Sequence, residues 1–166
     1  MLDKQPVLHL VCGKIASGKS TLAQRLALHP KTVLISEDQW LSKLYPDEMT
    51  TVQDYLKYST RLRTMMGQHI TLLLQEGLCV VMDFPANTVG LRKWMWSIFE
   101  NADAAHELHF LDTPDKLCKE RLSKRNEDGQ HEFAPSEAEF DLISSYFIPP
   151  TPEEGFNITI HTEAES

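Results

Sequence analysis

Cysteine is scarce in this sequence, and the spacing of the few cysteines argues against both structural disulfides and a structural zinc site. The 166 residues include three cysteines, Cys12, Cys79 and Cys118, and no CxxC pair. A disulfide framework normally has an even number of cysteines, and a cysteine-based zinc site has paired spacing. We therefore expect free thiols, which suit the reducing cytoplasm. The seven histidines also lack a metal-ligand spacing such as HExxH, which predicts structural roles for them.

Long hydrophobic runs and an excess of basic residues are missing as well. The apolar segments VLHLVC and LCVVM have the length of strands, well short of the ~18 residues that a membrane span requires. The N-terminal MLDKQP has neither the basic start nor the apolar stretch of a secretory signal. The formal net charge is −8, whereas a general nucleic-acid binder normally presents a basic face. We expect a cytoplasmic protein with no membrane partner, and nucleic acid is disfavoured, although a local basic pocket is compatible with this charge.

Apolar runs of strand length alternate with segments of helical periodicity along the chain. The expected strands are 7–12, 32–36, 78–84, 107–112 and 156–161, and the expected helices are 18–28, 52–75, 88–100, 114–125 and 136–147. This alternation predicts an α/β fold with a parallel sheet covered by helices on both faces. The length fits a single domain over residues 1–166. The oligomeric state is left open.

Helix-end signals add detail in the second half of the chain. Thr113 and Pro114 predict the N-cap and the first turn of one helix. Ser136 followed by Glu139 predicts a capping box for the next. Between these helices, the polar segment 126–137 carries turn residues and is expected to form a mobile loop.

The stretch GKIASGKST, residues 13–21, directly follows the first expected strand. Its pattern G-x-x-x-x-G-K-[ST], known as Walker A, predicts a phosphate-binding loop between a strand and a helix. Two glycines let backbone N–H groups curl around an anion, and the following helix directs its positive end to the same point. The alternative without phosphate binding is a glycine-rich turn with a solvated lysine. The predicted nucleotide-binding residues are Gly13, Lys14, Ile15, Ala16, Ser17, Gly18, Lys19, Ser20 and Thr21.

Two carboxylates follow later strands and predict further parts of the site. Asp38 comes just after the second strand, beside the phosphate loop if the sheet is parallel, where it can accept a hydroxyl proton. Its neighbour Glu37 is an alternative base, and capping of a helix is the structural alternative for both. Asp83 ends the third strand like a Walker B acid, and with the Ser20 hydroxyl it predicts a Mg²⁺ site. Substrate binding is the alternative role for Asp83.

Arginines supply the remaining candidates. Arg121 and Arg125 are four residues apart, so they share a helix face just before the polar segment. Arginines that a closing lid brings to the active site neutralise charge on a transferring phosphoryl group. The alternative for Arg121 and Arg125 is that they lie on a solvated helix face. Asn87, Arg92 and Arg61 are weaker candidates for contact with an acceptor, and for Arg92 and Arg61 a plain surface position is an equal reading.

Four motifs in this order resemble the small P-loop kinases of the AAA_33 type. They are GKIASGKST after the first strand, SED after the second, VVMDFPANT with the third and RLSKRNEDG before the polar segment. The likeness runs from about residue 6 to residue 147. This group is similar to the kinase domain of bacteriophage polynucleotide kinase, to chloramphenicol phosphotransferase and to zeta toxins.

The resemblance implies a three-layer P-loop NTPase fold with a five-stranded sheet and a small lid at about 121–137. It implies that Asp38 is the general base, that Arg125, with Arg121 beside it, supports the transferring phosphoryl group, and that Asp83 is the acid ending the third strand. One departure is the sequence DQWLSK after the base, where the family often has arginine. That departure and the extra charge of Glu37 disfavour a nucleic-acid acceptor.

The sequence therefore predicts an ATP- and Mg²⁺-dependent kinase for a small hydroxyl-bearing acceptor. Two alternatives stay open. One is a polynucleotide 5′-hydroxyl kinase, which would need a basic groove leading to Asp38. The other is an ATP-binding switch that transfers nothing. Neither the acceptor nor a preference for ATP over GTP follows from the sequence, because it has no clear base-reading signature such as NKxD.

Overall fold

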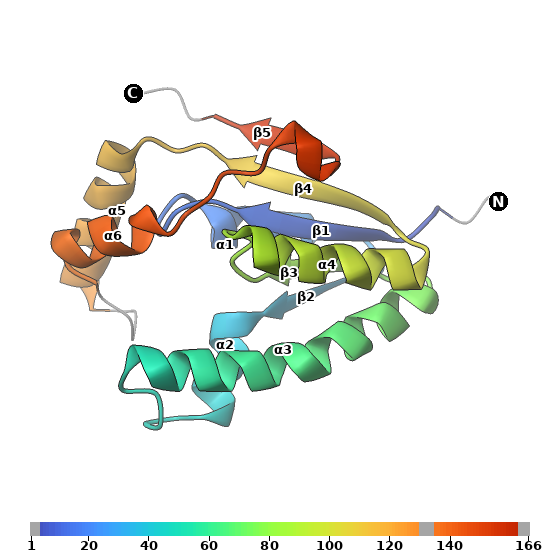
Figure 1. Ribbon diagram of the computed structural model, residues 1–166, viewed down its shortest axis with the longest axis horizontal. Helices are drawn as coiled ribbons and strands as arrows, with labels where there is room; N and C mark the ends of the chain where they lie inside the picture. The colour runs from blue at the N-terminus through green and yellow to red at the C-terminus, as the bar shows by residue number, and fades with distance from the viewer. Residues whose placement is uncertain (1–3, 130–134, 163–166) are drawn as a thin grey trace.

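A five-stranded, fully parallel sheet forms the centre of the computed structural model, which describes residues 4–129 and 135–162 (Figure 1). The strand order is β2–β3–β1–β4–β5. The strands are β1 (Val7–Cys12), β2 (Thr32–Ser36), β3 (Cys79–Asp83), β4 (Ala105–Leu111) and β5 (Ile158–His161). The order places β1, which leads into the phosphate loop, in the middle of the sheet, and the predicted fold class is confirmed.

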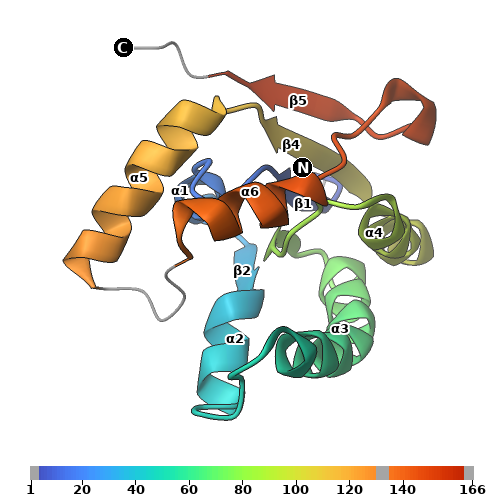
Figure 2. The ribbon, with the colours of Figure 1, turned by 60° about the vertical axis from the view of Figure 1, so that its left-hand side comes forward.

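Helices lie on both faces of the sheet and beyond the carboxyl ends of its strands. They are α1 (Lys19–Leu26), α2 (Glu37–Leu44), α3 (Val52–Gln75), α4 (Val89–Ala102), α5 (Asp115–Asp128) and α6 (Glu137–Ser145), with a short 3₁₀ turn, η1 (Pro152–Glu154). Side chains of α3 and α4 share the main core with one face of the sheet, and α1 packs on the other face. Figures 1 and 2 show α5 and α6 past the carboxyl ends of the strands, on the same side as α2.

The main core explains why the central strands read as apolar runs. Leu8, Leu10, Val80 and Met82 are fully buried on β1 and β3. Leu8 pairs with Val80 and Leu10 with Met82 across these strands. Each such side chain contributes about 1.5–3 kcal/mol by leaving water. This packing fixes the edge of the sheet at which the functional groups collect. Among the described residues, no helix is both long and apolar enough to cross a membrane.

Three local predictions need correction. A separate helix, α2, begins at Glu37, and Ser36 caps it by accepting a hydrogen bond from the Gln39 N–H at 3.4 Å. Thr113 does not cap α5, because its hydroxyl donates to the Ser17 carbonyl at 2.9 Å and Pro114 takes the cap position. Residues 126–128, predicted to be loop, continue α5. Residues 130–134 of that predicted loop lie outside the described part of the chain.

Helices α5 and α6 form a small second core against the phosphate loop. Phe140 of α6 is fully buried with Cys118 and Leu122 of α5, and Ile15 and Ala16 of the loop pack against them. Lys119 of α5 also pairs with two carboxylates of α6, at 2.9 Å from Asp141 Oδ1 and 3.3 Å from Glu137 Oε1. The predicted capping box of Ser136 and Glu139 is confirmed at the start of α6.

Candidate functional site

The phosphate loop connects the end of β1 to the start of α1. Its curl requires left-handed backbone at two positions, Ala16 with φ 60° and Gly18 with φ 104°. Glycine adopts that region freely, whereas alanine is strained there, so the packing of Ala16 against the cluster of Cys118, Leu122 and Phe140 must help to hold the loop. Ile15 lies in the same contact, and Thr21 is exposed on the first turn of α1.

Gly13, the first loop residue, is held from three directions. A Cβ at this position would lie 2.5 Å from Ser17 Oγ and 3.1 Å from the Leu111 carbonyl oxygen, so only glycine fits. Asn87, which follows β3, holds both peptide groups of Gly13. Its Oδ1 accepts from the Gly13 N–H at 3.1 Å, and its Nδ2 donates to the Gly13 carbonyl at 2.9 Å. Asn87, predicted to face an acceptor, is therefore a support of the loop.

Lys19 and Lys14 point in different directions. Lys19 Nζ donates to the carbonyls of Gly13 at 2.6 Å and Lys14 at 2.8 Å, inside the curl of the loop. Burial lowers the pKa of Lys19, and the charge of Asp83 opposes that shift. Lys14 turns outward and pairs with Asp115 Oδ1 at 2.6 Å, which ties the loop to α5. Lys19 is therefore the cation placed to meet an anion bound by the loop.

Ser20 and Asp83 meet at the base of α1, as expected for a pair of metal ligands. The Ser20 hydroxyl donates to Asp83 Oδ2 at 3.0 Å. Burial raises the pKa of Asp83, the bond from Ser20 opposes this, and the charge of Asp38 adds to it. Hydroxyl and carboxylate oxygens are the ligands that Mg²⁺ prefers, so these two residues fit such an ion.

Asp38 lies in the first turn of α2, just past the end of β2, and its side chain has no capping role because Ser36 caps the helix. The residue is exposed on one side. Loss of water on its other sides raises the pKa of Asp38, and the positive charges of Lys19 and Arg125 act against that rise. A carboxylate reachable from solvent thus lies within the electrostatic reach of the phosphate-loop lysine and of α5.

The side chain of Glu37, the alternative base, is buried and already paired with other side chains. Its side chain is 1% exposed, and Oε1 pairs with Arg63 Nη2 at 2.8 Å. The Tyr55 hydroxyl donates to Oε2 at 3.4 Å. Burial raises the pKa of Glu37 to about 7 despite the charge of Arg63. Sequence reasoning did not bring Tyr55 or Arg63 into this contact, because both partners come from the distant α3.

The two arginines of α5 lie close to different parts of the site. Arg121 Nη1 donates to the Ser17 carbonyl at 3.4 Å, beside the hydroxyl of Thr113. Arg125 lies near enough to Asp38 for its charge to act on that carboxyl. Arg125 Nε is shielded from water and has no hydrogen-bond acceptor among the described residues. Thr113 and Arg121 therefore support the Ser17 carbonyl, while the charge of Arg125 acts on Asp38.

Two weaker candidates lie elsewhere. Arg92, predicted to contact an acceptor or to lie on the surface, is fully buried in α4. It donates to Glu154 Oε1 at 2.8 Å and to the carbonyls of Ala86 at 2.9 Å and Ile148 at 2.8 Å. It joins the chain after β3 to the segment before β5 and cannot reach a ligand. Arg61 is exposed on α3, with its guanidinium 5.7 Å from the ring centre of Tyr58.

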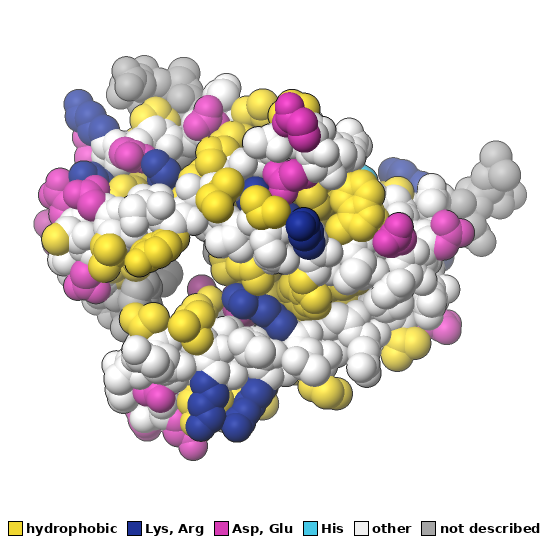
Figure 3. Space-filling model, viewed as in Figure 1, with side chains coloured by type: hydrophobic (Ala, Val, Ile, Leu, Met, Phe, Trp, Pro, Cys, Tyr) yellow, Lys and Arg dark blue, Asp and Glu magenta, His cyan; other side chains and the backbone are white. Residues whose placement is uncertain are grey.

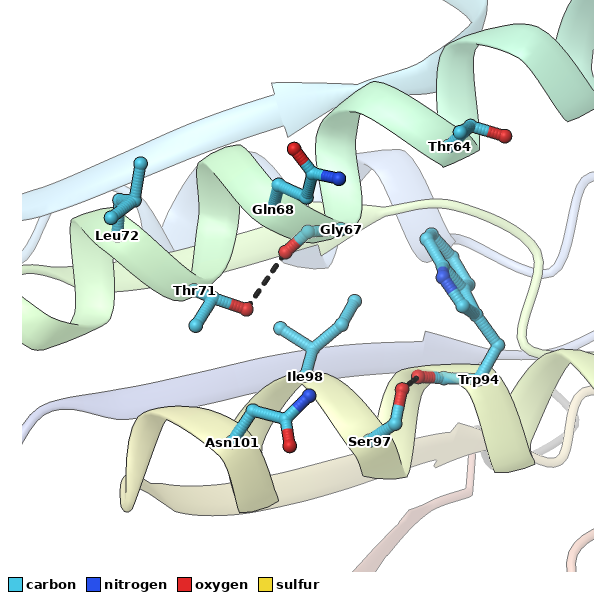
Figure 4. Close-up of a pocket in the computed structure, with 9 residues that line it drawn as sticks. All are labelled: Thr64, Gly67, Gln68, Thr71, Leu72, Trp94, Ser97, Ile98 and Asn101. Atoms are coloured by element: carbon cyan, nitrogen blue, oxygen red, sulfur yellow. Dashed lines mark hydrogen bonds between the residues drawn. The ribbon is translucent and has the colours of Figure 1, made fainter.

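Figure 3 shows a hollow between α6 and the start of α3, with apolar side chains on its rim, in front of the carboxyl ends of the strands. A separate groove of about 460 Å³ lies between α3 and α4 (Figure 4). There Gly67 lets the Trp94 indole approach α3, since a Cβ would lie 3.3 Å from its Nε1. The hydroxyls of Thr71 and Ser97 bond to carbonyls of their own helices, so this groove offers few free polar groups to a ligand.

Comparison with known proteins agrees with this fold. A candidate kinase from Chloroflexus aurantiacus j-10-fl is 24% identical, with a TM-score of 0.74 over 96% of this chain and 86% of that one. The Mycobacterium tuberculosis APS kinase CysC, in complex with AMPPNP and APS, is 20% identical, with a TM-score of 0.62 over 98% and 91%. A chain of the Pnkp1/Rnl/Hen1 RNA repair complex is 19% identical, with a TM-score of 0.69 over 86% and 44%.

No curated protein matches the chain. These structural likenesses establish a kinase-like P-loop fold. Residues 8–150, most of the sequence, match the AAA_33 family, described as an AAA domain. The chain therefore belongs to the AAA_33 family of AAA domains.

Proposed function

We propose that this protein transfers the γ-phosphoryl group of ATP to a hydroxyl of a small-molecule acceptor. The observation that carries the proposal is the position of Asp38. Its carboxyl lies past the end of β2, open to solvent, and the charges of Lys19 and Arg125 act on it. Phosphoryl transfer needs these groups together: cations on the phosphates and a base for the acceptor hydroxyl.

The phosphate loop and Lys19 hold the nucleotide in this mechanism. Loop N–H groups and the N-terminus of α1 bind phosphate oxygens. Lys19 Nζ exchanges its bonds to the Gly13 and Lys14 carbonyls for contacts with the outer phosphates. Ser20 and Asp83 would hold Mg²⁺, which would neutralise charge on the phosphate oxygens.

Asp38 accepts the proton of the acceptor hydroxyl as that oxygen attacks the γ-phosphorus. The new bond joins the acceptor oxygen to phosphorus, the bond from phosphorus to the β,γ-bridging oxygen breaks, and ADP leaves with the electron pair. Asp38 suits this role better than Glu37, because Glu37 is buried and already held by Arg63 and Tyr55. Arg125 places positive charge beside the transferring group, and residues 121–128 of α5 are the described part of the predicted lid.

A small acceptor fits the charge of this region better than a polynucleotide. The acceptor would approach the acids Asp38 and Asp83, in a chain whose formal net charge is −8. A polynucleotide would bring its own phosphates against these groups. The likeness to the RNA repair complex keeps 5′-hydroxyl oligonucleotides in the acceptor panel, where contacts to phosphates would appear as steep salt dependence.

The test measures ADP release from MgATP with a panel of hydroxyl compounds and 5′-hydroxyl oligonucleotides. We expect one small acceptor class to accelerate release, and Asp38→Asn to lower transfer by roughly 10²–10⁴-fold while nucleotide affinity is retained. Asp47→Asn is the matched control, because Asp47 is an exposed loop residue after α2. Full activity of Asp38→Asn would remove this residue from the mechanism. Slow hydrolysis that no acceptor accelerates, together with a nucleotide-dependent partner, would instead favour an ATP-driven switch.

A further inference from the structure

A row of polar side chains crosses β1, β4 and β5 on the face of the sheet where α1 packs. Val11 and Leu111 on that face contact α1, and the alternation of each strand places His9, Glu107 and His109 on the same face. The register then sets His9 beside Glu107, and His109 beside Thr159 of β5. We call the set His9, Glu107, His109, Thr159 and His161 the histidine cluster.

Three atoms of the histidine cluster form a triangle of the size that a metal ion fills. His9 Nδ1 and His109 Nε2 are 3.1 Å apart, and Glu107 Oε2 lies 3.8 Å from the first and 3.7 Å from the second. A triangle with these sides has a centre about 2.1 Å from each corner, which is the length of Zn–N and Zn–O bonds, about 2.0–2.2 Å. The three atoms can therefore ligate one ion with little movement.

The far ends of two of these ligands are also held, as they are in established metal sites. His109 Nδ1 lies 3.0 Å from His161 Nε2, so an imidazole that binds metal through Nε2 can donate its Nδ1 proton to His161. The Thr159 hydroxyl donates to Glu107 Oε1 at 2.6 Å, which leaves Oε2 facing the histidines. Both supporting residues belong to β5, so three strands contribute to the arrangement.

The same face also gives an ion a route from solvent. The side chain of Glu107 is 33% exposed and that of His9 is 16% exposed, whereas His109 is buried beneath them. The open side leaves room for water as a further ligand. Two imidazoles and one carboxylate favour a transition metal of the zinc type over Mg²⁺, which prefers oxygen ligands alone.

We propose that His9, Glu107 and His109 bind one divalent transition-metal ion, with Zn²⁺ as the preferred ion, and that His161 and Thr159 orient the ligands. The ion joins β1 to β4 on the sheet, apart from the nucleotide and from the Mg²⁺ ligands Ser20 and Asp83. The proposal does not depend on the proposed kinase activity. It revises the structural role that sequence spacing predicted for these histidines.

Titration calorimetry of the metal-free full chain with ZnCl₂ tests the site. We expect one equivalent to bind, a rise in the thermal midpoint, and the intense visible absorption of a low-coordinate ion when Co²⁺ replaces Zn²⁺. Glu107→Gln and His9→Gln should each weaken binding by at least about 10–100-fold, since even support residues have effects of this size. His69→Gln, which changes an exposed histidine on α3, is the control and should bind like the parent.

Circular dichroism of the metal-free variants confirms that they fold, and Glu107→Gln keeps an oxygen for the Thr159 bond. If a variant fails to fold, histidine NMR signals of the parent protein decide: Zn²⁺ should shift those of His9 and His109 but not that of His69. Stoichiometric binding that survives both substitutions, or parent signals unmoved by Zn²⁺, would show the histidine cluster to be only a hydrogen-bonded stack and overturn the proposal.

Discussion

The phosphate loop and the histidine cluster both depend on β1, yet the chain builds them in opposite ways. Residues 13–21 are consecutive, and their glycines, lysine and hydroxyls act together because one strand ends and one helix begins there. The histidine cluster draws on residues 9, 107, 109, 159 and 161, which meet only through strand register. A local site can be recognised from spacing, whereas a site built by register becomes visible only when the order of the strands is known.

Arg92 gives the largest expected effect, because it joins Ala86, next to the Asn87 that holds Gly13, to the segment that leads into β5. It holds the segment between α6 and β5 through Ile148 and Glu154. Arg92→Met leaves the Glu154 carboxylate without its partner and should lower the free energy of unfolding by about 3–5 kcal/mol. Denaturant unfolding measures this, with exposed Lys93→Met as the control. Equal stabilities of the two variants would show that the buried guanidinium is dispensable.

Arg125 tests whether the phosphate site and the histidine cluster are independent, because phosphoryl transfer should depend on Arg125 and Zn²⁺ binding should not. Arg125→Ala should lower phosphoryl transfer by roughly 10²–10³-fold, the usual effect of losing one group that stabilises developing charge. The neighbouring Lys124 is exposed, so Lys124→Ala should retain most of the rate. Single-turnover kinetics with the identified acceptor separate the two variants. Zn²⁺ affinity should be the same in both, and a joint loss of transfer and Zn²⁺ binding would contradict the separation of the two sites.

Glu37 tests a contact between α2 and α3 that is distant in the sequence and lies next to the proposed base Asp38. Its pKa is raised from 4.5 to about 7 by burial, so the folded state holds this proton more tightly than the unfolded chain does. The resulting stability is complete below pH 4.5 and is lost as the pH rises through about 7. The free energy of unfolding of the parent should therefore fall by about 1–3 kcal/mol relative to Glu37→Gln between pH 4.5 and 8.

Urea unfolding at several pH values measures this difference. Glu48→Gln, which changes an exposed carboxyl near the end of α2, should keep the pH dependence of the parent. A parent and a Glu37→Gln variant with parallel pH profiles would mean that Arg63 keeps Glu37 charged throughout the range.

Two glycines give the smallest and most local test. Gly13→Ala places a Cβ 2.5 Å from Ser17 Oγ, so overpacking should cost about 1–3 kcal/mol and weaken nucleotide binding. A Cβ at Gly90, in the first turn of α4, meets nothing within 4 Å. Gly90→Ala should therefore leave nucleotide binding unchanged and stabilise the protein by up to about 1 kcal/mol. Thermal shift and nucleotide titration compare the two, and a Gly13→Ala variant that binds like the parent would disprove the tight approach.

Sequence reasoning succeeded where a local pattern carries the signal, such as the alternation of strands and helices or a short motif at a strand end. It predicted the five parallel strands and the AAA_33 family, and the Ser20–Asp83 contact agrees with its expectation of a shared site. It failed for Arg92, since nothing near that residue in the sequence indicates that Glu154 and the Ile148 carbonyl would surround it. It misplaced the cap of α5 for a related reason: the Thr113 hydroxyl is drawn to the Ser17 carbonyl, which is 96 positions away.

The amide of Asn87 has a consequence for how the nucleotide site is prepared. One planar side chain grips both peptide groups of Gly13, and Asn87 itself lies four residues past Asp83. These two hydrogen bonds thereby fix the end of β3, which carries Asp83, to the phosphate loop, which carries Ser20. The entropy cost of bringing the Ser20 and Asp83 oxygens to within 3.0 Å of each other is met during folding. The proposed nucleotide site is therefore already organised before a nucleotide binds.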